Sequence, residues 1–151
     1  MPVTDEQVAA LRAFLTFDPS YQRLAGELNT SGRARGFGEL VYAAFVTAAR
    51  RRFSPTWTSA QIVHFAAQLR VVLRAYDVDL DPRAIEILLR QALGEHVTSG
   101  YDDGTHALVM LFGLGELASD ERLDEAGLDA FVADARTLAD ARLAAQSGSQ
   151  S

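Results

Sequence analysis

The segment from Glu95 to His106 gathers the side chains of this chain that are best suited to chemistry. His96, Asp102, Asp103 and His106 all lie within it. Imidazole and carboxylate groups together can ligate Zn²⁺, Mn²⁺ or Fe²⁺, and they can also act as a general acid and base. The segment therefore suggests one function, that of a metal-dependent enzyme or a ligand-binding protein.

The same segment is also typical of a plain connection between two helices, and we favour this interpretation. Its spacing matches no metal-binding motif such as His-Glu-x-x-His. Ser99-Gly100 and Asp103-Gly104 are dipeptides that favour turns, and Thr105 is suited to cap a following helix. We therefore expect no metal site and no cofactor here, and the sequence names no catalytic residue.

Arg50, Arg51 and Arg52 form the second group of candidate residues. Consecutive arginines can contact phosphate groups, and residues 33 to 90 carry nine arginines against five acidic residues, which suggests a nucleic-acid-binding regulator. The alternative is an interaction with the negative end of a helix dipole. The chain has a net charge of −6, and residues 95 to 151 carry three arginines against eleven acidic residues. This acidity argues against nucleic-acid binding.

The spacing of apolar residues predicts an all-α fold, a single-domain bundle of six or seven helices. No segment shows the sustained alternation of a strand. The helix expected over residues 59–76 has a broad apolar face that includes Val63, Ala67 and Val71, so we expect it to be the buried central helix of the bundle. The helices are expected at residues 5–16, 19–28, 38–53, 59–76, 82–93, 105–118 and 125–145.

Several helix starts carry recognisable capping signals. Thr4 with Gln7, and Thr58 with Gln61, have the pattern of a capping box, in which threonine and glutamine side chains each accept a hydrogen bond from the other residue's backbone amide. Asp81-Pro82 places a capping aspartate before a proline, which is favoured at the first helical position. These signals make the helix starts the best-determined part of the prediction.

The composition limits the chemistry and suggests an origin. The chain of 151 residues has no lysine and no cysteine, and its fourteen basic residues are all arginine. The lack of cysteine excludes a disulfide framework, a thiolate zinc site and a cysteine nucleophile. Arginine, alanine, glycine and leucine at the expense of lysine and asparagine are what a GC-rich codon pool produces, so we expect a bacterial protein from a high-GC genome.

We expect a cytoplasmic protein that binds no membrane. The first six residues are acidic and lack the apolar region of a signal peptide. The longest apolar run, residues 107–114, is too short to span a bilayer. Residues 1–145 are expected to form one helical domain, and residues 146–151, which consist of Ser, Gly and Gln, are expected to form a disordered tail.

Five short segments combine core and capping positions, and they are Tyr42-Ala43-Ala44-Phe45, Arg51-Arg52-Phe53, Ile62-Val63-His64-Phe65, Asp79-Leu80-Asp81-Pro82 and Ala92-Leu93-Gly94-Glu95. In this pattern, residues 42–95 resemble uncharacterised actinobacterial helical proteins of unknown function. The resemblance covers about a third of the chain. It implies no activity and no functional residue.

The sequence specifies a core and helix caps well, whereas it contains no set of residues with the spacing of a known catalytic or binding site. We therefore favour a non-catalytic protein-interaction or regulatory helical module, which binds a protein partner or associates with itself through an apolar helix face. The metal-dependent enzyme or ligand-binding protein ranks second, and the nucleic-acid-binding regulator ranks third. The sequence identifies no small-molecule ligand.

Overall fold

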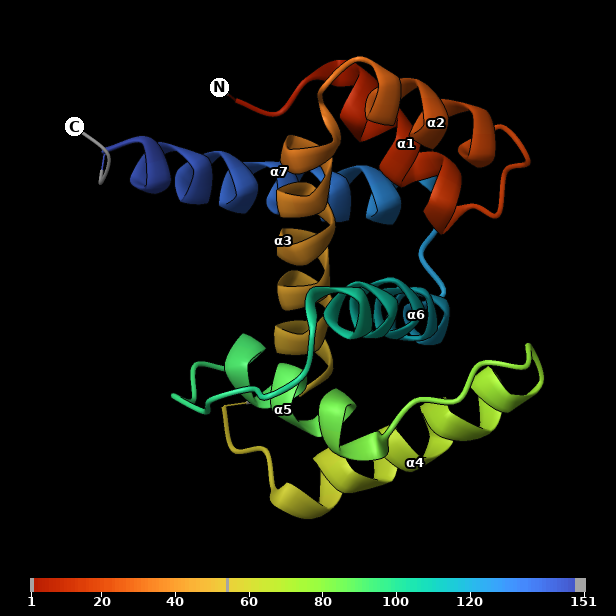
Figure 1. Cartoon of the computed structure of the whole chain (residues 1–151), viewed down its shortest axis with the longest axis vertical. Coiled ribbons are helices and arrows are strands. Elements are labelled where there is room, and N and C mark those ends of the chain that lie inside the picture. Colours follow the sequence, from red (N-terminus) through yellow and green to blue (C-terminus); the bar gives the residue numbers. More distant parts are fainter. Residues whose placement is uncertain (1, 54, 149–151) are drawn as a thin grey trace. The chain divides into compact units, whose positions relative to one another are not determined.

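The structure is a computed structural model that describes residues 2–53 and 55–148. These residues form seven α-helices and no strand, which confirms the predicted all-α bundle (Figure 1). The helices are α1 (Asp5–Leu15), α2 (Tyr21–Thr30), α3 (Ala34–Arg52), α4 (Ser59–Arg74), α5 (Pro82–Ala92), α6 (Asp103–Glu121) and α7 (Glu125–Gly148). Within the described part of the chain, none of these helices has the length and apolar character that a membrane span requires.

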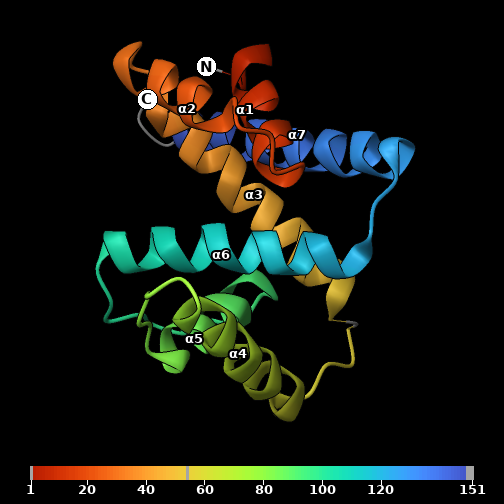
Figure 2. The ribbon, with the colours of Figure 1, turned by 90° about the vertical axis from the view of Figure 1, so that its right-hand side faces the viewer.

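Backbone contacts divide the chain into two compact units. The first contains Met1–Thr47 and Arg122–Ser151, and the second contains Ala48–Glu121, so α3 contributes residues to both. In the first unit, α1 packs against α2 and against α7 (Figure 1). In the second unit, α5 packs against α4 and against α6 (Figure 2). The single domain expected over residues 1–145 stays a prediction.

The helix starts use the capping chemistry that the sequence predicts. At α1, Thr4 Oγ1 accepts a hydrogen bond from Gln7 N at 3.3 Å, and Gln7 Oε1 accepts one from Thr4 N at 2.8 Å. Thr58 and Gln61 form the same reciprocal pair at the start of α4. Asp81 caps α5 by accepting a hydrogen bond from the backbone two residues later. Each cap satisfies amide groups that the first turn of a helix leaves without partners.

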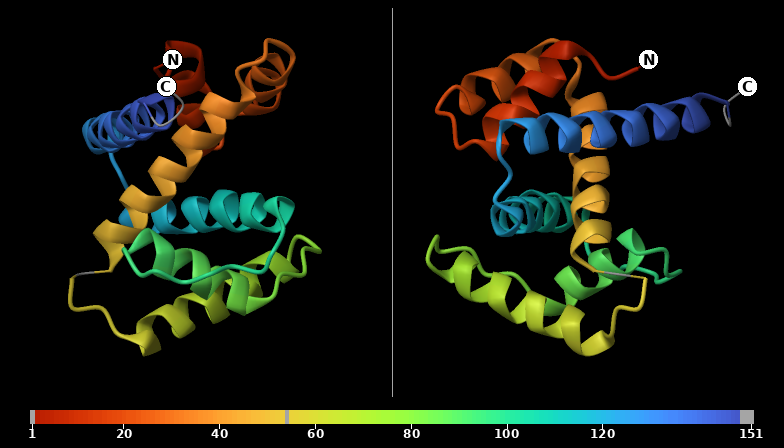
Figure 3. Two further views of the ribbon diagram at one scale, coloured as in Figure 1. Left: turned by 60° about the vertical axis from the view of Figure 1, so that its left-hand side comes forward. Right: turned by 180° about the vertical axis from the view of Figure 1, so that it is seen from behind.

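The prediction that residues 59–76 form the buried central helix is wrong. The buried residues of α4 lie on one face, and they are Ile62, Phe65, Ala66, Leu69 and Leu73. Val63 and Val71, which we expected to widen this buried face, are 49% and 70% exposed. The physical reason is that α5 and α6 both lie on the same side of α4 (Figure 3).

The buried residues are more continuous along α3 than along α4. Between Leu40 and Ala49, every residue except Tyr42 and Thr47 is buried. This helix begins at Ala34, four residues before the expected start, and it contains Gly36 and Gly38.

The last two helices also extend beyond their predicted bounds. The helix α6 begins at Asp103 rather than Thr105, because Asp102 caps it by accepting a hydrogen bond from Thr105 N at 2.7 Å. The helix α7 continues to Gly148, so residues 146–148 are helical although we expected them in a disordered tail. Residues 149–151 of that expected tail lie outside the described residues.

Candidate functional site

The connection between α5 and α6 contains the predicted polar cluster. It runs as an extended chain from one helix to the other (Figure 3). Asp102 caps the start of α6, and the hydrogen bond from Thr105 N holds the pKa of the Asp102 carboxyl below its ordinary value. Asp103 is the exposed first residue of the same helix. Both carboxylates therefore belong to a helix start.

His106 forms a short hydrogen bond that the sequence did not predict. Its Nε2 lies 2.6 Å from Ser99 Oγ, and that oxygen also accepts a hydrogen bond from Tyr101 N at 3.3 Å. A serine and a histidine at this distance can act as nucleophile and base when a third group orients the imidazole. Asp102, whose carboxylate interacts electrostatically with His106, instead uses Oδ1 to cap α6. The pair is therefore suited to holding the connection against α6.

His96 does not join this group. Its side chain is exposed, and it forms no hydrogen bond with the described residues. Across residues 2–53 and 55–148, no three His, Cys, Asp or Glu side chains are arranged to hold a metal ion. The structure thus brings together His106 with Ser99 and Asp102 with Thr105, but it does not assemble the four predicted residues. The enzyme hypothesis gains no support from this geometry.

The arginines at the end of α3 contact groups of this chain. Arg50 Nε donates to Ala92 O, a carbonyl at the end of α5, at 3.2 Å. Arg51 pairs with Glu121 at 3.8 Å. The guanidinium of Arg52 lies 5.7 Å from the centre of the adjacent Phe53 ring. Basic groups at the carboxyl end of a helix are also favoured by the helix dipole, so each arginine has a structural role.

Carboxylates share the surface around these arginines. Asp120 and Glu121 line a depression together with Arg51, Arg52 and Gln68. A polyanion that approached this depression would meet both signs of charge. The surface at this place is therefore not uniformly basic, as a surface that binds nucleic acid would be, and it does not support the nucleic-acid hypothesis.

The exposed side of α4 carries an apolar ridge that the sequence analysis assigned to the core. Val63, Ala67 and Val71 follow one another at intervals of four residues, and all three are exposed. Ala60 extends the ridge toward the start of the helix. Periodicity alone revealed these residues but could not show which apolar positions remain uncovered.

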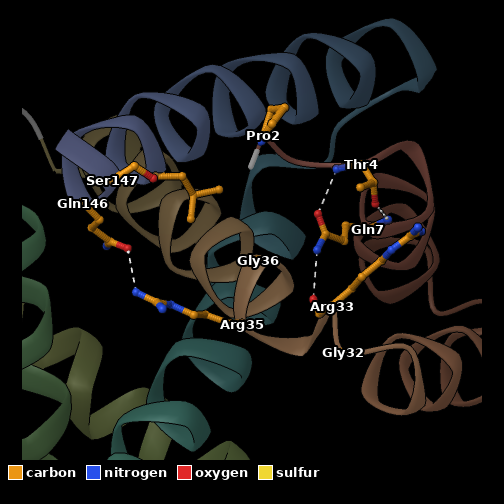
Figure 4. Close-up of a pocket in the computed structure, with 10 residues that line it drawn as sticks. Pro2, Thr4, Gln7, Gly32, Arg33, Arg35, Gly36, Gln146 and Ser147 are labelled. Carbon is orange, nitrogen blue, oxygen red and sulfur yellow. Dashed lines mark hydrogen bonds between the residues drawn. The ribbon is translucent and has the colours of Figure 1, made fainter. Parts of the chain in front are cut away.

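The first unit contains a pocket of about 220 Å³ (Figure 4). Two arginines and no carboxylate line it, and the lining residues are Pro2, Thr4, Gln7, Gly32, Arg33, Arg35, Gly36, Leu143, Gln146 and Ser147. Gln7 forms part of the wall, where its Nε2 donates to Arg33 O at 2.9 Å. Sequence reasoning did not find this pocket because its wall comes from three segments that lie far apart in the chain.

Comparisons with protein-family models, with curated proteins and with solved structures found no match to this chain. The resemblance of residues 42–95 to actinobacterial helical proteins therefore stays a prediction.

Proposed function

We propose that the protein is a non-catalytic interaction module that binds a second copy of itself through the outer ridge of α4. The outer ridge consists of Ala60, Val63, Ala67 and Val71. The observation that supports the proposal is that Val63 and Val71 are 49% and 70% exposed on a helix whose opposite face is buried. Exposed apolar side chains at four-residue spacing form a ridge that packs well between the ridges of another helix.

The spacing of the ridge favours a symmetric partner. Val63 lies four residues before Ala67, and Val71 lies four residues after it. In an antiparallel pair related by a two-fold axis, Ala67 meets Ala67 and Val63 meets Val71 of the second copy. The small alanine at the centre allows the helix axes to approach to about 8 Å, the lower end of the usual range.

The charges beside the ridge also favour a second copy over an acidic partner. The helix α4 contains no carboxylate, and its arginines are Arg70 and Arg74. Carboxylates of this chain lie near both: Asp77 and Asp79 line a depression with Arg74, and Asp81 interacts electrostatically with Arg70. Because these charges are already balanced, an acidic partner has little to gain at this surface.

The size of the ridge predicts weak self-association. The sixteen residues of α4 extend over roughly 24 Å. A single contact between two such helices buries less than the roughly 800 Å² per partner of a standard interface. We therefore expect a monomer that dimerises reversibly as its concentration rises.

A single introduced cysteine tests the symmetry directly, because the chain has no cysteine of its own. In Ala67→Cys the two thiols would face each other across the two-fold axis, within the distance that a disulfide requires. Ala75→Cys is the matched control, since Ala75 is also exposed but lies about 12 Å further along the helix. Mild oxidation should produce a covalent dimer from Ala67→Cys much faster than from Ala75→Cys. Equal rates, or faster cross-linking of Ala75→Cys, would contradict the symmetric arrangement.

Sedimentation of the full chain over a wide concentration range supplies the second test. Val71→Glu should weaken self-association by about tenfold or more, because it places a charge against Val63 of the second copy in the apolar contact. Leu108→Glu, at an exposed apolar residue of α6, is the control and should dimerise like the wild type. A wild type that stays monomeric at every concentration would reject self-association. If that monomer bound an added helical partner instead, the ridge would be an interface for another protein, and self-association would likewise be rejected.

A further inference from the structure

We propose that the pocket of the first unit binds a small oxyanion, a carboxylate or phosphate group, between Gln7 and Arg35. This site lies in a different unit from the outer ridge of α4, so it does not depend on the proposed self-association. It also differs in kind, since it would take a small molecule rather than a protein.

Gln7 supplies a buried side-chain amide at the pocket wall. Its side chain belongs to a residue that is only 3% exposed, and contacts at both ends orient the amide: Oε1 accepts from Thr4 N, and Nε2 donates to Arg33 O. A primary amide has two N–H groups. The second N–H of Gln7 has no partner among the described residues. That N–H is available to an acceptor in the pocket, such as an oxyanion oxygen.

Gly36 keeps that nitrogen at the pocket wall. A Cβ atom at position 36 would lie 2.5 Å from Gln7 Nε2, which is far too close for a contact between these atoms. The absence of a side chain therefore leaves the Gln7 amide next to the start of α3, where Gly36 also lines the pocket (Figure 4).

Arg35 supplies the positive charge. Its guanidinium donates to the neutral amide oxygen of Gln146 at 3.4 Å and forms no ion pair within the described residues. Arg33 is less available because it pairs with Glu6 at 3.3 Å. A guanidinium binds carboxylate and phosphate oxygens through two parallel hydrogen bonds. Arg35 is thus the cation that an oxyanion in this pocket would meet.

The surrounding charges leave room for an anion. No carboxylate lines the pocket, and the nearby Glu39, which interacts electrostatically with Arg35, forms its hydrogen bonds with Arg142 at 3.0 Å and with Gln146 at 2.9 Å. The volume of about 220 Å³ is smaller than the roughly 300–1,000 Å³ of pockets for drug-sized ligands. These observations fit a small molecule that carries a single carboxylate or phosphate group.

The test is an NMR titration of the full chain with inorganic phosphate, acetate and chloride at matched ionic strength. We expect saturable shifts of the Gly36 backbone amide and the Gln7 side-chain amide with phosphate or acetate, and none with chloride. Whichever of the two oxyanions binds more tightly identifies the chemical source of the ligand. Shifts that grow linearly with all three salts would indicate an adventitious ion only and would overturn the proposal.

Two arginine variants make the titration specific. Arg35→Gln should weaken binding by about tenfold or more, because it removes the charge and keeps a polar side chain. Arg23→Gln is the control, since Arg23 is an exposed arginine of α2 in the same unit and lies outside the pocket lining. It should bind as the wild type does. Equal affinity of Arg35→Gln and the wild type would overturn the assignment of Arg35.

Discussion

Gln7 and Arg33 join the starts of two helices through one hydrogen bond. The Gln7 amide belongs to the first turn of α1, and it donates through Nε2 to the backbone oxygen of Arg33, the residue before α3, at 2.9 Å. The same amide accepts from Thr4 N, so a single side chain completes a local cap and makes a tertiary contact. This double role explains why a glutamine is buried here although its type is mostly exposed in proteins.

Replacing Gln7 should therefore cost more than replacing an ordinary capping residue. Gln7→Ala leaves Thr4 N and Arg33 O without their partner, and we expect a loss of about 2–3 kcal/mol in the free energy of unfolding. Gln61→Ala is the matched control, because Gln61 occupies the same place in the capping box of α4 but is exposed. It should cost less than about 1 kcal/mol. Urea denaturation measures both, and equal losses would show that the contact with Arg33 contributes nothing.

Two glycines of α3 should respond to alanine with opposite signs. Gly36→Ala places a Cβ atom 2.5 Å from Gln7 Nε2, and the buried glutamine cannot move without losing its hydrogen bonds. We expect a destabilisation of about 1–3 kcal/mol.

Gly38→Ala is the control for that substitution. A Cβ at position 38 meets nothing within 4 Å, so the better helix propensity of alanine should stabilise the protein by about 0.5–1 kcal/mol. Thermal or urea unfolding of the two variants measures the sign of each change in stability. A stabilised Gly36→Ala would contradict the close approach of Gln7 to α3.

The pKa of the Asp81 carboxyl should depend on the hydroxyl group of Tyr101. The hydroxyl of Tyr101 donates to Asp81 Oδ2 at 2.7 Å, and this hydrogen bond is the main cause that lowers the pKa of the Asp81 carboxyl. Because the pKa of the Asp81 carboxyl is lower in the folded state than in the unfolded state, its carboxylate stabilises the fold at every pH above the unfolded-state pKa. That contribution is lost as the pH falls through the folded pKa.

Tyr101→Phe should raise the pKa of Asp81 toward its ordinary value, so the loss would begin at a higher pH. NMR titration of the side-chain carboxyl carbons measures this directly. The carboxyl of Asp102 is the internal control, because its pKa is lowered chiefly by the hydrogen bond from Thr105 N and should not change. An unaltered pKa of Asp81 would contradict the linkage.

Arg142 combines a stacking contact with an ion pair. Its guanidinium lies 4.3 Å from the centre of the Tyr42 ring, and its Nε donates to Glu39 at 3.0 Å. A lysine in this place keeps the charge but loses the planar group that stacks on the ring. A double-mutant cycle of Arg142→Lys and Tyr42→Leu should therefore give a coupling energy of about 0.5–1 kcal/mol in urea unfolding. Additive losses would show that stacking does not stabilise the first unit.

The Glu39 carboxyl gives an independent readout of the same arginine. Burial raises its pKa, but hydrogen bonds from Gln146 and Arg142 outweigh this effect and leave the pKa below its ordinary value. Arg142→Met should therefore raise the pKa of Glu39, whereas Arg142→Lys should raise it less because the positive charge remains.

Much of the helical structure follows from interactions within short stretches of chain. The capping boxes of Thr4 and Thr58 and the cap at Asp81 involve neighbours no more than three residues away, so their residue types suffice to predict them. The same holds for the seven helices, whose apolar spacing is visible over two or three turns. Glycine predicts helix ends less well, because Gly36 and Gly38 lie inside α3.

Candidate sites were far less predictable from sequence. The loop with His96 and His106 gathers polar residues in sequence, yet its side chains cap α6 and bond to Ser99. The pocket of the first unit went unnoticed because Gln7, Arg35 and Gln146 meet only after α1, α3 and α7 have formed.

The amino-acid order alone thus determines where helices form, since hydrogen bonds and caps act between near neighbours. Which side of each helix is covered depends on packing between segments that are distant in the chain. Val63, Ala67 and Val71 are as apolar as the core residues of α4, and nothing in their local pattern marks them as exposed. They remain exposed because α5 and α6 pack on one side of the helix, and that choice arises from the total burial of all the helices together.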